Sequence, residues 1–185
     1  MISALRPLTK LLGTNLVGAT FLAATFLMAA APAHSATPTD PQIAHIAYTA
    51  GDIDVKAAKL ALSKSKNKDV IAFANNMLSD HQAVNDKALA LVKKLKVTPE
   101  DNDTSKALVK QAAAEREKLS KLSGAAFDKA YAANELAFHE TVDGALKDTL
   151  IPNAKNPELK DLLSTGLKIF QGHQEHAQML VNELK

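Results

Sequence analysis

Residues 68–96, KDVIAFANNMLSDHQAVNDKALALVKKLK, carry the pattern that decides the fold class. One stripe of residues recurs at alternating spacings of four and three, which is typical of a helix packed in a bundle. Its members are Val70, Ala74, Met77, His81, Val84, Ala88, Leu91 and Leu95. His81 is therefore expected in the packing face of a long helix, where apolar side chains are the rule.

The chain after Pro41 is rich in Ala, Leu, Lys and Glu, and its helix-breaking residues gather in a few short segments. These breaks predict helices over residues 41–64, 68–96, 104–122, 125–149 and 157–184. Short loops join the first pair and the last pair, so each pair is expected to be antiparallel. The helix over 104–122 is long enough to run back along the bundle, which makes its two neighbours parallel. We therefore predict an all-α, ferritin-like four-helix bundle with a helical crossover between the second and third bundle helices.

Residues 1–36 have the organisation of a signal peptide. Arg6 and Lys10 precede the uncharged run LLGTNLVGATFLAATFLMAAA, and APAHSA then supplies the small residues of a cleavage site. The alternative is an uncleaved membrane anchor, since the apolar run is about long enough to span a bilayer. The bundle domain is then 37–185. The absence of cysteine excludes a lipoprotein anchor and disulfides, and export to a bacterial periplasm or envelope fits this pattern.

The charge balance argues against a nucleic-acid partner. Without Arg6 and Lys10, the chain carries 20 basic and 20 acidic residues, and it contains few aromatic residues and no Trp. Nucleic-acid-binding proteins carry a basic patch or stripe instead. No membrane span is expected in the mature chain, and the sequence leaves its protein partners open.

The other predicted helices also carry polar residues in their packing stripes. Counted along the helices, these residues and His81 all fall near the middle of the bundle. One buried layer is therefore predicted, formed by Asp54, His81, Glu135, His139, His173 and His176. The spacings of Glu135 with His139, and of His173 with His176, bring each pair to one side of its helix.

Buried imidazoles and carboxylates without partners are costly, and a transition-metal ion is one way to satisfy them. Imidazole and carboxylate donors suit zinc, iron, manganese or copper, whereas calcium and magnesium need more oxygen ligands. The alternative is a hydrogen-bonded histidine network without metal, structural or pH-sensitive. Asp80 is a candidate to orient the imidazole of His81.

Four segments resemble the exported bacterial domain-of-unknown-function family 4142, whose members carry the label "predicted outer membrane protein". They are NMLSDHQAVN (76–85), GAAFDKAYAANELAFHETV (124–142), LIPNAKNPELKDLL (150–163) and FQGHQEHA (170–177). The resemblance covers about residues 42–182 and implies a ferritin-like bundle. By this resemblance His81, Tyr131, His139 and His173 match family positions, and Glu135 and His176 match a subgroup. Leu167-Lys168 replaces the usual Leu-Pro before the last helix's histidine.

Two functions are expected from these features. The first is an exported bundle of uncharacterised role that binds a transition metal through the histidine-rich layer. The alternative is an envelope or stress-related interaction protein whose histidines form a polar network. A metal-linked redox or hydrolytic enzyme is a further alternative, which would need an open coordination position. It is less favoured, because there is no nucleophile and base motif and no complete di-iron motif of Glu-x-x-His pairs.

Overall fold

The computed structural model describes residues 37–185. Its long helices are α1 (Asp40–Lys64), α2 (Lys68–Leu95), α3 (Asp103–Ser120), α4 (Gly124–Ala145) and α6 (Pro157–Glu183). A π-helical segment, η1 (Leu146–Leu150), and the short helix α5 (Ile151–Asn153) continue the path of α4. The predicted signal peptide lies outside the described residues.

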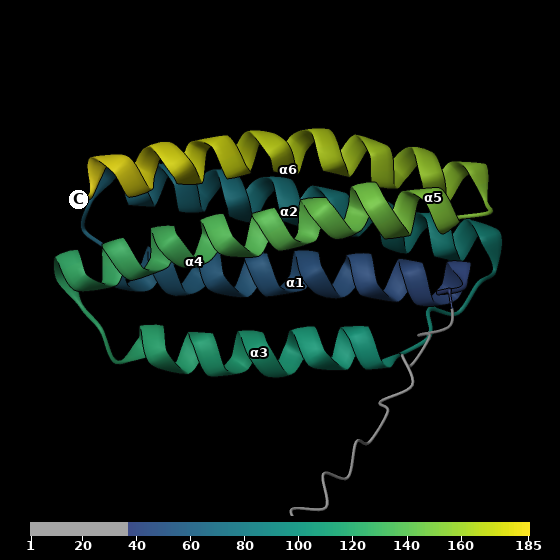
Figure 1. Cartoon of the computed structure of the whole chain (residues 1–185), viewed down its shortest axis with the longest axis horizontal. Helices are drawn as coiled ribbons and strands as arrows, with labels where there is room; N and C mark the ends of the chain where they lie inside the picture. The colour runs from purple at the N-terminus through teal and green to yellow at the C-terminus, as the bar shows by residue number, and fades with distance from the viewer. Residues whose placement is uncertain (1–36) are drawn as a thin grey trace, which may run out of the picture. The chain divides into compact units, whose positions relative to one another are not determined.

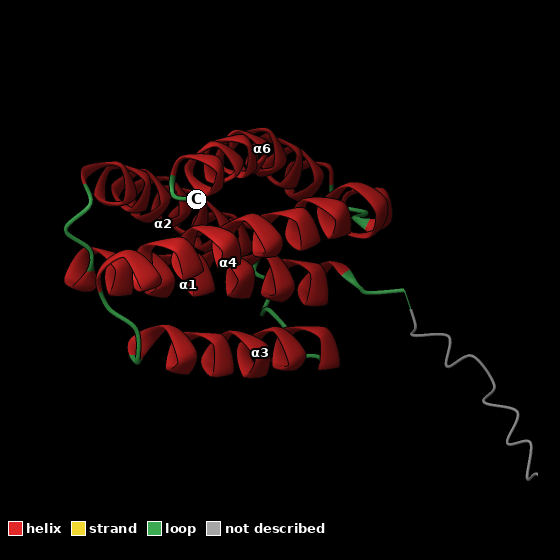
Figure 2. Ribbon diagram, turned by 60° about the vertical axis from the view of Figure 1, so that its left-hand side comes forward, coloured by secondary structure: helices red, strands yellow, loops and turns green. Residues whose placement is uncertain are grey.

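Four helices, α1, α2, α4 and α6, form a bundle, and α3 runs along the outer side of α1 (Figure 1). The helices α1 and α2 are antiparallel, as are α4 and α6, while α2 and α4 run in the same direction. Figure 2 shows the crossover helix α3 separated from α2 and α6 by the α1–α4 layer. The predicted all-α bundle with a helical crossover is therefore confirmed.

Local sequence explains where the helices begin. The side-chain oxygen of Asn67 accepts hydrogen bonds from the backbone of Asp69 and Val70 at the start of α2. Asn156 does the same for Glu158 and Leu159 at the start of α6, where Pro157 occupies the first turn. Such caps satisfy backbone donors that have no partner within the helix, and they set the register of α2 and α6.

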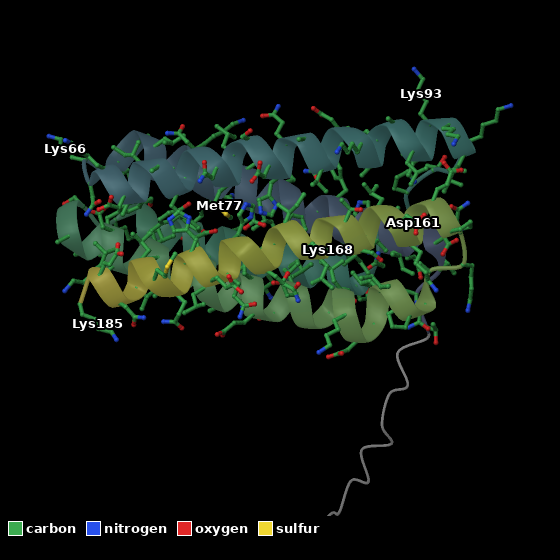
Figure 3. All side chains as sticks on the ribbon, turned by 90° about the horizontal axis from the view of Figure 1, so that it is seen from above. Lys66, Met77, Lys93, Asp161, Lys168 and Lys185 are labelled. Atoms are coloured by element: carbon green, nitrogen blue, oxygen red, sulfur yellow. The ribbon has the colours of Figure 1, made fainter. Side chains whose placement is uncertain are left out.

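The apolar core is divided into two clusters. One surrounds Phe73, Met77 and Tyr131, and the other surrounds Ile43, Leu163 and Phe170. Figure 3 shows Met77 inside the bundle, whereas Lys66, Lys93 and Lys185 extend away from it. Between the two clusters along each helix lie buried polar residues, so the core is interrupted by a polar layer at mid-bundle.

The packing stripe of α2 is fully buried in its first half and partly buried in its second half. Val70, Ala74, Met77 and His81 are buried, but beyond them Asn85 is buried and Val84 only partly so. A strict seven-residue repeat drifts by about 20° per heptad around a straight α-helix. The drift moves the stripe toward the edge of the core after His81, where Val84 and Leu91 pack, partly buried, against the second apolar cluster.

Candidate metal centre

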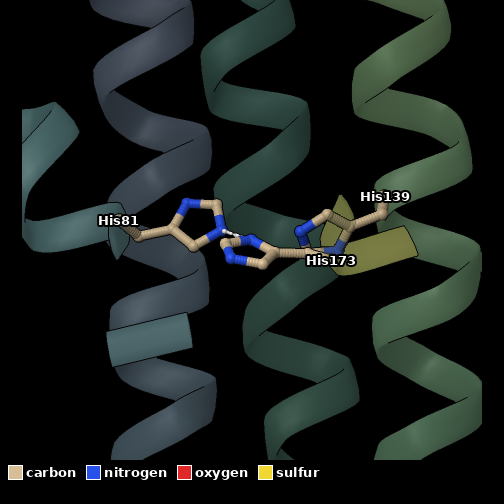
Figure 4. A group of neighbouring side chains, drawn as sticks. All are labelled: His81, His139 and His173. Carbon is tan, nitrogen blue, oxygen red and sulfur yellow. Dashed lines mark hydrogen bonds between the residues drawn. The ribbon is translucent and has the colours of Figure 1, made fainter. Parts of the chain in front are cut away.

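Three histidines from three helices converge in the polar layer. His81 of α2, His139 of α4 and His173 of α6 are 1%, 1% and 7% exposed. The three rings lie close together, with His173 Nδ1 3.3 Å from His81 Nε2 (Figure 4). One nitrogen from each ring lies within 4.8 Å of the other two, which is a spacing that a single cation could span.

Two of these rings are held from outside by hydrogen-bond acceptors. Nδ1 of His139 lies 2.9 Å from the carbonyl oxygen of Glu135, and Nε2 of His173 lies 3.0 Å from Asp80 Oδ2. A carbonyl or carboxylate oxygen only accepts, so the facing nitrogen carries the proton. The lone pairs of His139 and His173 are then on the inward nitrogens. Partners of this kind orient the histidine ligands of metal ions.

The role of Asp80 differs from the prediction. The adjacent residues Asp80 and His81 point in different directions from α2, because neighbours on a helix are separated by about 100°. Asp80 therefore reaches His173 on α6 instead of orienting His81. His81 has another carboxylate nearby, since its Nδ1 lies 3.4 Å from Asp54 Oδ2, although without an aligned hydrogen bond.

A second group of donors adjoins the first. Asp54 of α1, Glu135 and His139 each offer an atom within 4.8 Å of the other two, and all three side chains are buried. Glu135 Oε1 accepts a hydrogen bond from Asn134 Nδ2 at 3.2 Å. Asp54 Oδ1, Glu135 Oε2 and His139 Nε2 have no hydrogen-bond partner. His139 thus belongs to both groups.

No cationic side chain compensates this layer. Among residues 37–185, no lysine or arginine is buried, whereas Asp54, Glu135 and Asp143 are. Both carboxylate oxygens of Asp143, one turn beyond His139, lack a partner. Orphaned buried polar atoms cost about 1–3 kcal/mol each. The layer therefore offers a cation several unpartnered oxygen atoms and no competing positive side chain.

Burial lowers the pKa values of the imidazoles in the layer and raises those of the carboxyl groups. It lowers the pKa of His139 to about 4, and burial together with the neighbouring His139 and His173 lowers the pKa of His81. Burial raises the pKa of Glu135 to about 8, and burial with the charge of Glu135 raises the pKa of Asp54. At neutral pH the imidazoles are therefore unprotonated and ready to bind a metal, while the carboxylates tend to keep a proton until a cation displaces it.

Apolar and aromatic groups close the site. The ring of Phe170 stacks on His81 with a centroid separation of 4.4 Å and an interplanar angle of 8°. The hydroxyl of Tyr131 is also buried and has no hydrogen-bond partner. Burial, with the charges of Glu135 and Asp54, raises the pKa of Tyr131. Water is thus largely excluded, which strengthens electrostatic interactions in the layer.

Five of the six residues predicted for the layer come together, and His176 does not. His176 is half-buried and packs edge-on against Phe73, with ring centroids 5.0 Å apart. The buried face of α6 passes through Phe170, His173 and Ala177 instead. Spacings of three and four residues both continue a helical stripe from His173, and the small Ala177 is the one that fits the core.

Asp143 is a buried carboxylate beside the layer that was not among the six predicted residues. The signal was available, because Glu135, His139 and Asp143 recur every four residues on α4. Asp143 falls near the end of the predicted helix, where a polar residue is ordinary. The π-helical segment η1 begins three residues later, so the helix continues and Asp143 stays buried.

The fold and this layer define the class of protein: an all-α, ferritin-like bundle with a histidine-rich polar centre. Residues 25–180 match the model of the Domain of unknown function (DUF4142), and the chain belongs to this family. No curated protein and no solved structure matches the chain. None of the helices in the described part of the chain is long and apolar enough to cross a membrane.

Proposed function

We propose that this protein is an exported bundle that binds a transition-metal ion through His81, His139 and His173. The observation that carries the proposal is that one ring nitrogen of His139 and one of His173 each direct a lone pair into the layer. His139 Nε2 has no partner, and His173 Nδ1 is directed at His81 Nε2 while Asp80 holds its other nitrogen. One nitrogen of each ring lies within 4.8 Å of the other two, so the three form a donor set for a single cation.

The donor set narrows the choice of cation. Neutral imidazoles suit zinc, copper and iron, and a carboxylate-poor set is a weak site for calcium or magnesium. Three protein ligands around zinc leave a fourth position open, as in catalytic sites. No reaction is part of this proposal, because no residue around the layer forms a nucleophile and base pair.

A histidine network without metal is the second candidate, and one observation favours it. Asp80, His173 and His81 form a continuous hydrogen-bonded chain that reaches from a half-exposed carboxylate into the core. In that case a proton lies between His81 and His173, where the first proposal puts a metal. The two candidates therefore differ in one measurable property, which is whether a cation stabilises the fold.

Metal binding is tested by the thermal midpoint of chelator-treated protein with and without zinc or copper. A ligand that binds only the folded state stabilises it by about 2.7 kcal/mol at 100 times its dissociation constant. We expect the metal to raise the thermal midpoint by an amount that corresponds to this stabilisation. The rise should be the same in the wild type and in His176→Gln, whose histidine lies against Phe73. Elemental analysis of protein purified without chelator should find about one bound ion per chain.

An unchanged midpoint with every metal, together with no retained ion, would favour the histidine network over metal binding. Loss of binding in His176→Gln would instead restore the larger ligand set predicted from the sequence.

Export rests on residues 1–36 and needs its own test. If this segment is a cleaved signal peptide, mass spectrometry of the protein from its native host should find a chain that begins around residues 34–37. The expected mass change is large, because the positive residues and the whole apolar run are removed. Recovery of a chain that still begins at Met1 would support a retained anchor.

A further inference from the structure

We propose that Asp54, Glu135 and His139 form a second cation subsite, which takes a harder divalent cation such as Mn²⁺ and competes with the three-histidine site for His139. This inference rests on the proposed function only in that the two sites share one histidine. The donor atoms of the three residues lie within 4.8 Å of one another. They come from α1 and from one face of α4.

The carboxylates of this subsite are buried and incompletely paired. Asp54 and Glu135 are 2% and 1% exposed, and Asp54 Oδ1 and Glu135 Oε2 accept no hydrogen bond. Acidic residues alone do not make a site, but His139 Nε2 is a further unpartnered atom on a side chain 1% exposed. Two carboxylates and an imidazole whose donor atoms lie within 4.8 Å of one another form a mixed oxygen and nitrogen donor set.

Asp143 extends the negative charge around this subsite. It lies four residues beyond His139 on α4, is 6% exposed, and has two unpartnered oxygens. It also acts electrostatically on Asp54. It takes no part in the three-histidine group. Carboxylate donors favour manganese over softer cations, so the two groups differ in the cation they prefer.

The two subsites cannot both use His139 at once. Its Nδ1 is committed to the carbonyl oxygen of Glu135 at 2.9 Å, which leaves a single lone pair on Nε2. One lone pair binds one cation. Occupation of the three-histidine site therefore removes a ligand from the carboxylate subsite, and the reverse also holds. The layer thus offers two alternative positions for a cation, and the hardness of the cation determines which of them it occupies.

The test is a titration of the chelator-treated full chain with Mn²⁺, followed by electron paramagnetic resonance, and a parallel titration with Zn²⁺. Glu135→Gln removes a donor of the carboxylate subsite but keeps the backbone carbonyl that holds His139. We expect Mn²⁺ to bind at least about tenfold more weakly and Zn²⁺ to change much less. His173→Gln should have the opposite effect, and in the wild type Zn²⁺ should displace bound Mn²⁺.

Asp143→Asn is a second variant that removes neighbouring charge without removing any of the three donors. It should weaken Mn²⁺ alone, and it keeps the test decisive if Glu135→Gln does not fold. The subsite is overturned if Mn²⁺ fails to bind, or binds equally well to the wild type and both carboxylate variants. Competition is overturned if one chain holds Zn²⁺ and Mn²⁺ together. Loss of Zn²⁺ binding alone, with Mn²⁺ behaviour as expected, would count against the proposed function and leave this subsite standing.

Discussion

Replacing His139 by glutamine is expected to weaken both zinc and manganese binding at least about 100-fold, because this side chain belongs to both donor groups. No other residue of the layer has this property. His173 serves only the three-histidine group, and Glu135 and Asp54 serve only the other. The effect on the metal-free fold should be small by comparison, since glutamine is polar and close in size to histidine.

The measurement is competition of each metal with a chelator of known affinity, read by a metal-sensitive dye. The matched control is His176→Gln, the same substitution at a histidine that packs against Phe73 outside the layer. A His139→Gln protein that keeps its affinity for both metals within about threefold, with an unchanged thermal midpoint, would show that His139 binds neither. The burial of His139 would then be explained by the hydrogen-bonded network instead of by metal binding.

The fold was predictable because its information is local and periodic. The stripe through Met77 and His81 and the short loops require packed antiparallel helices, and the length of α3 requires a crossover. The depth of each polar residue along its helix could be counted, since the rise per residue is fixed. This is why the sequence alone predicts Asp54, His81 and Glu135 in one layer.

What could not be predicted is the rotation of each helix about its axis. His173 belongs to every packing stripe that can be drawn along α6, but either His176 or Ala177 could be the next buried residue of that stripe. In the structure Ala177 is buried, and His176 packs against Phe73. The direction of Asp80 is a similar case, because it depends on how α6 sits beside α2. Spacing in sequence limits the candidates to two adjacent faces, and tertiary packing selects one.

The second large effect concerns Glu135→Gln, whose influence on stability should change sign when metal is added. Burial raises the pKa of Glu135 from 4.5 to about 8 in the folded protein. A raised folded-state pKa of an acid means that the unfolded chain loses its proton first as the pH rises. The wild-type carboxyl therefore contributes full stability below pH 4.5, and this contribution is lost progressively up to about pH 8.

Glutamine stays neutral throughout this range. The metal-free variant should accordingly match the wild type at about pH 4 and exceed its free energy of unfolding at about pH 8 by on the order of 4 kcal/mol. With saturating Mn²⁺ the order reverses, because the cation compensates the ionised carboxylate of the wild type and binds the variant poorly. Urea denaturation at both pH values, with and without Mn²⁺, measures all four differences.

Glu140→Gln is the control for this experiment, since Glu140 is exposed on the same helix and has no role in the layer. It should leave the free energy of unfolding nearly unchanged in every condition. If Glu135→Gln instead destabilises the metal-free protein at about pH 8, the Glu135 carboxylate is already compensated by a charge within the fold. The layer would then need no cation, and a closed polar network would be the better account of the residues that surround His139.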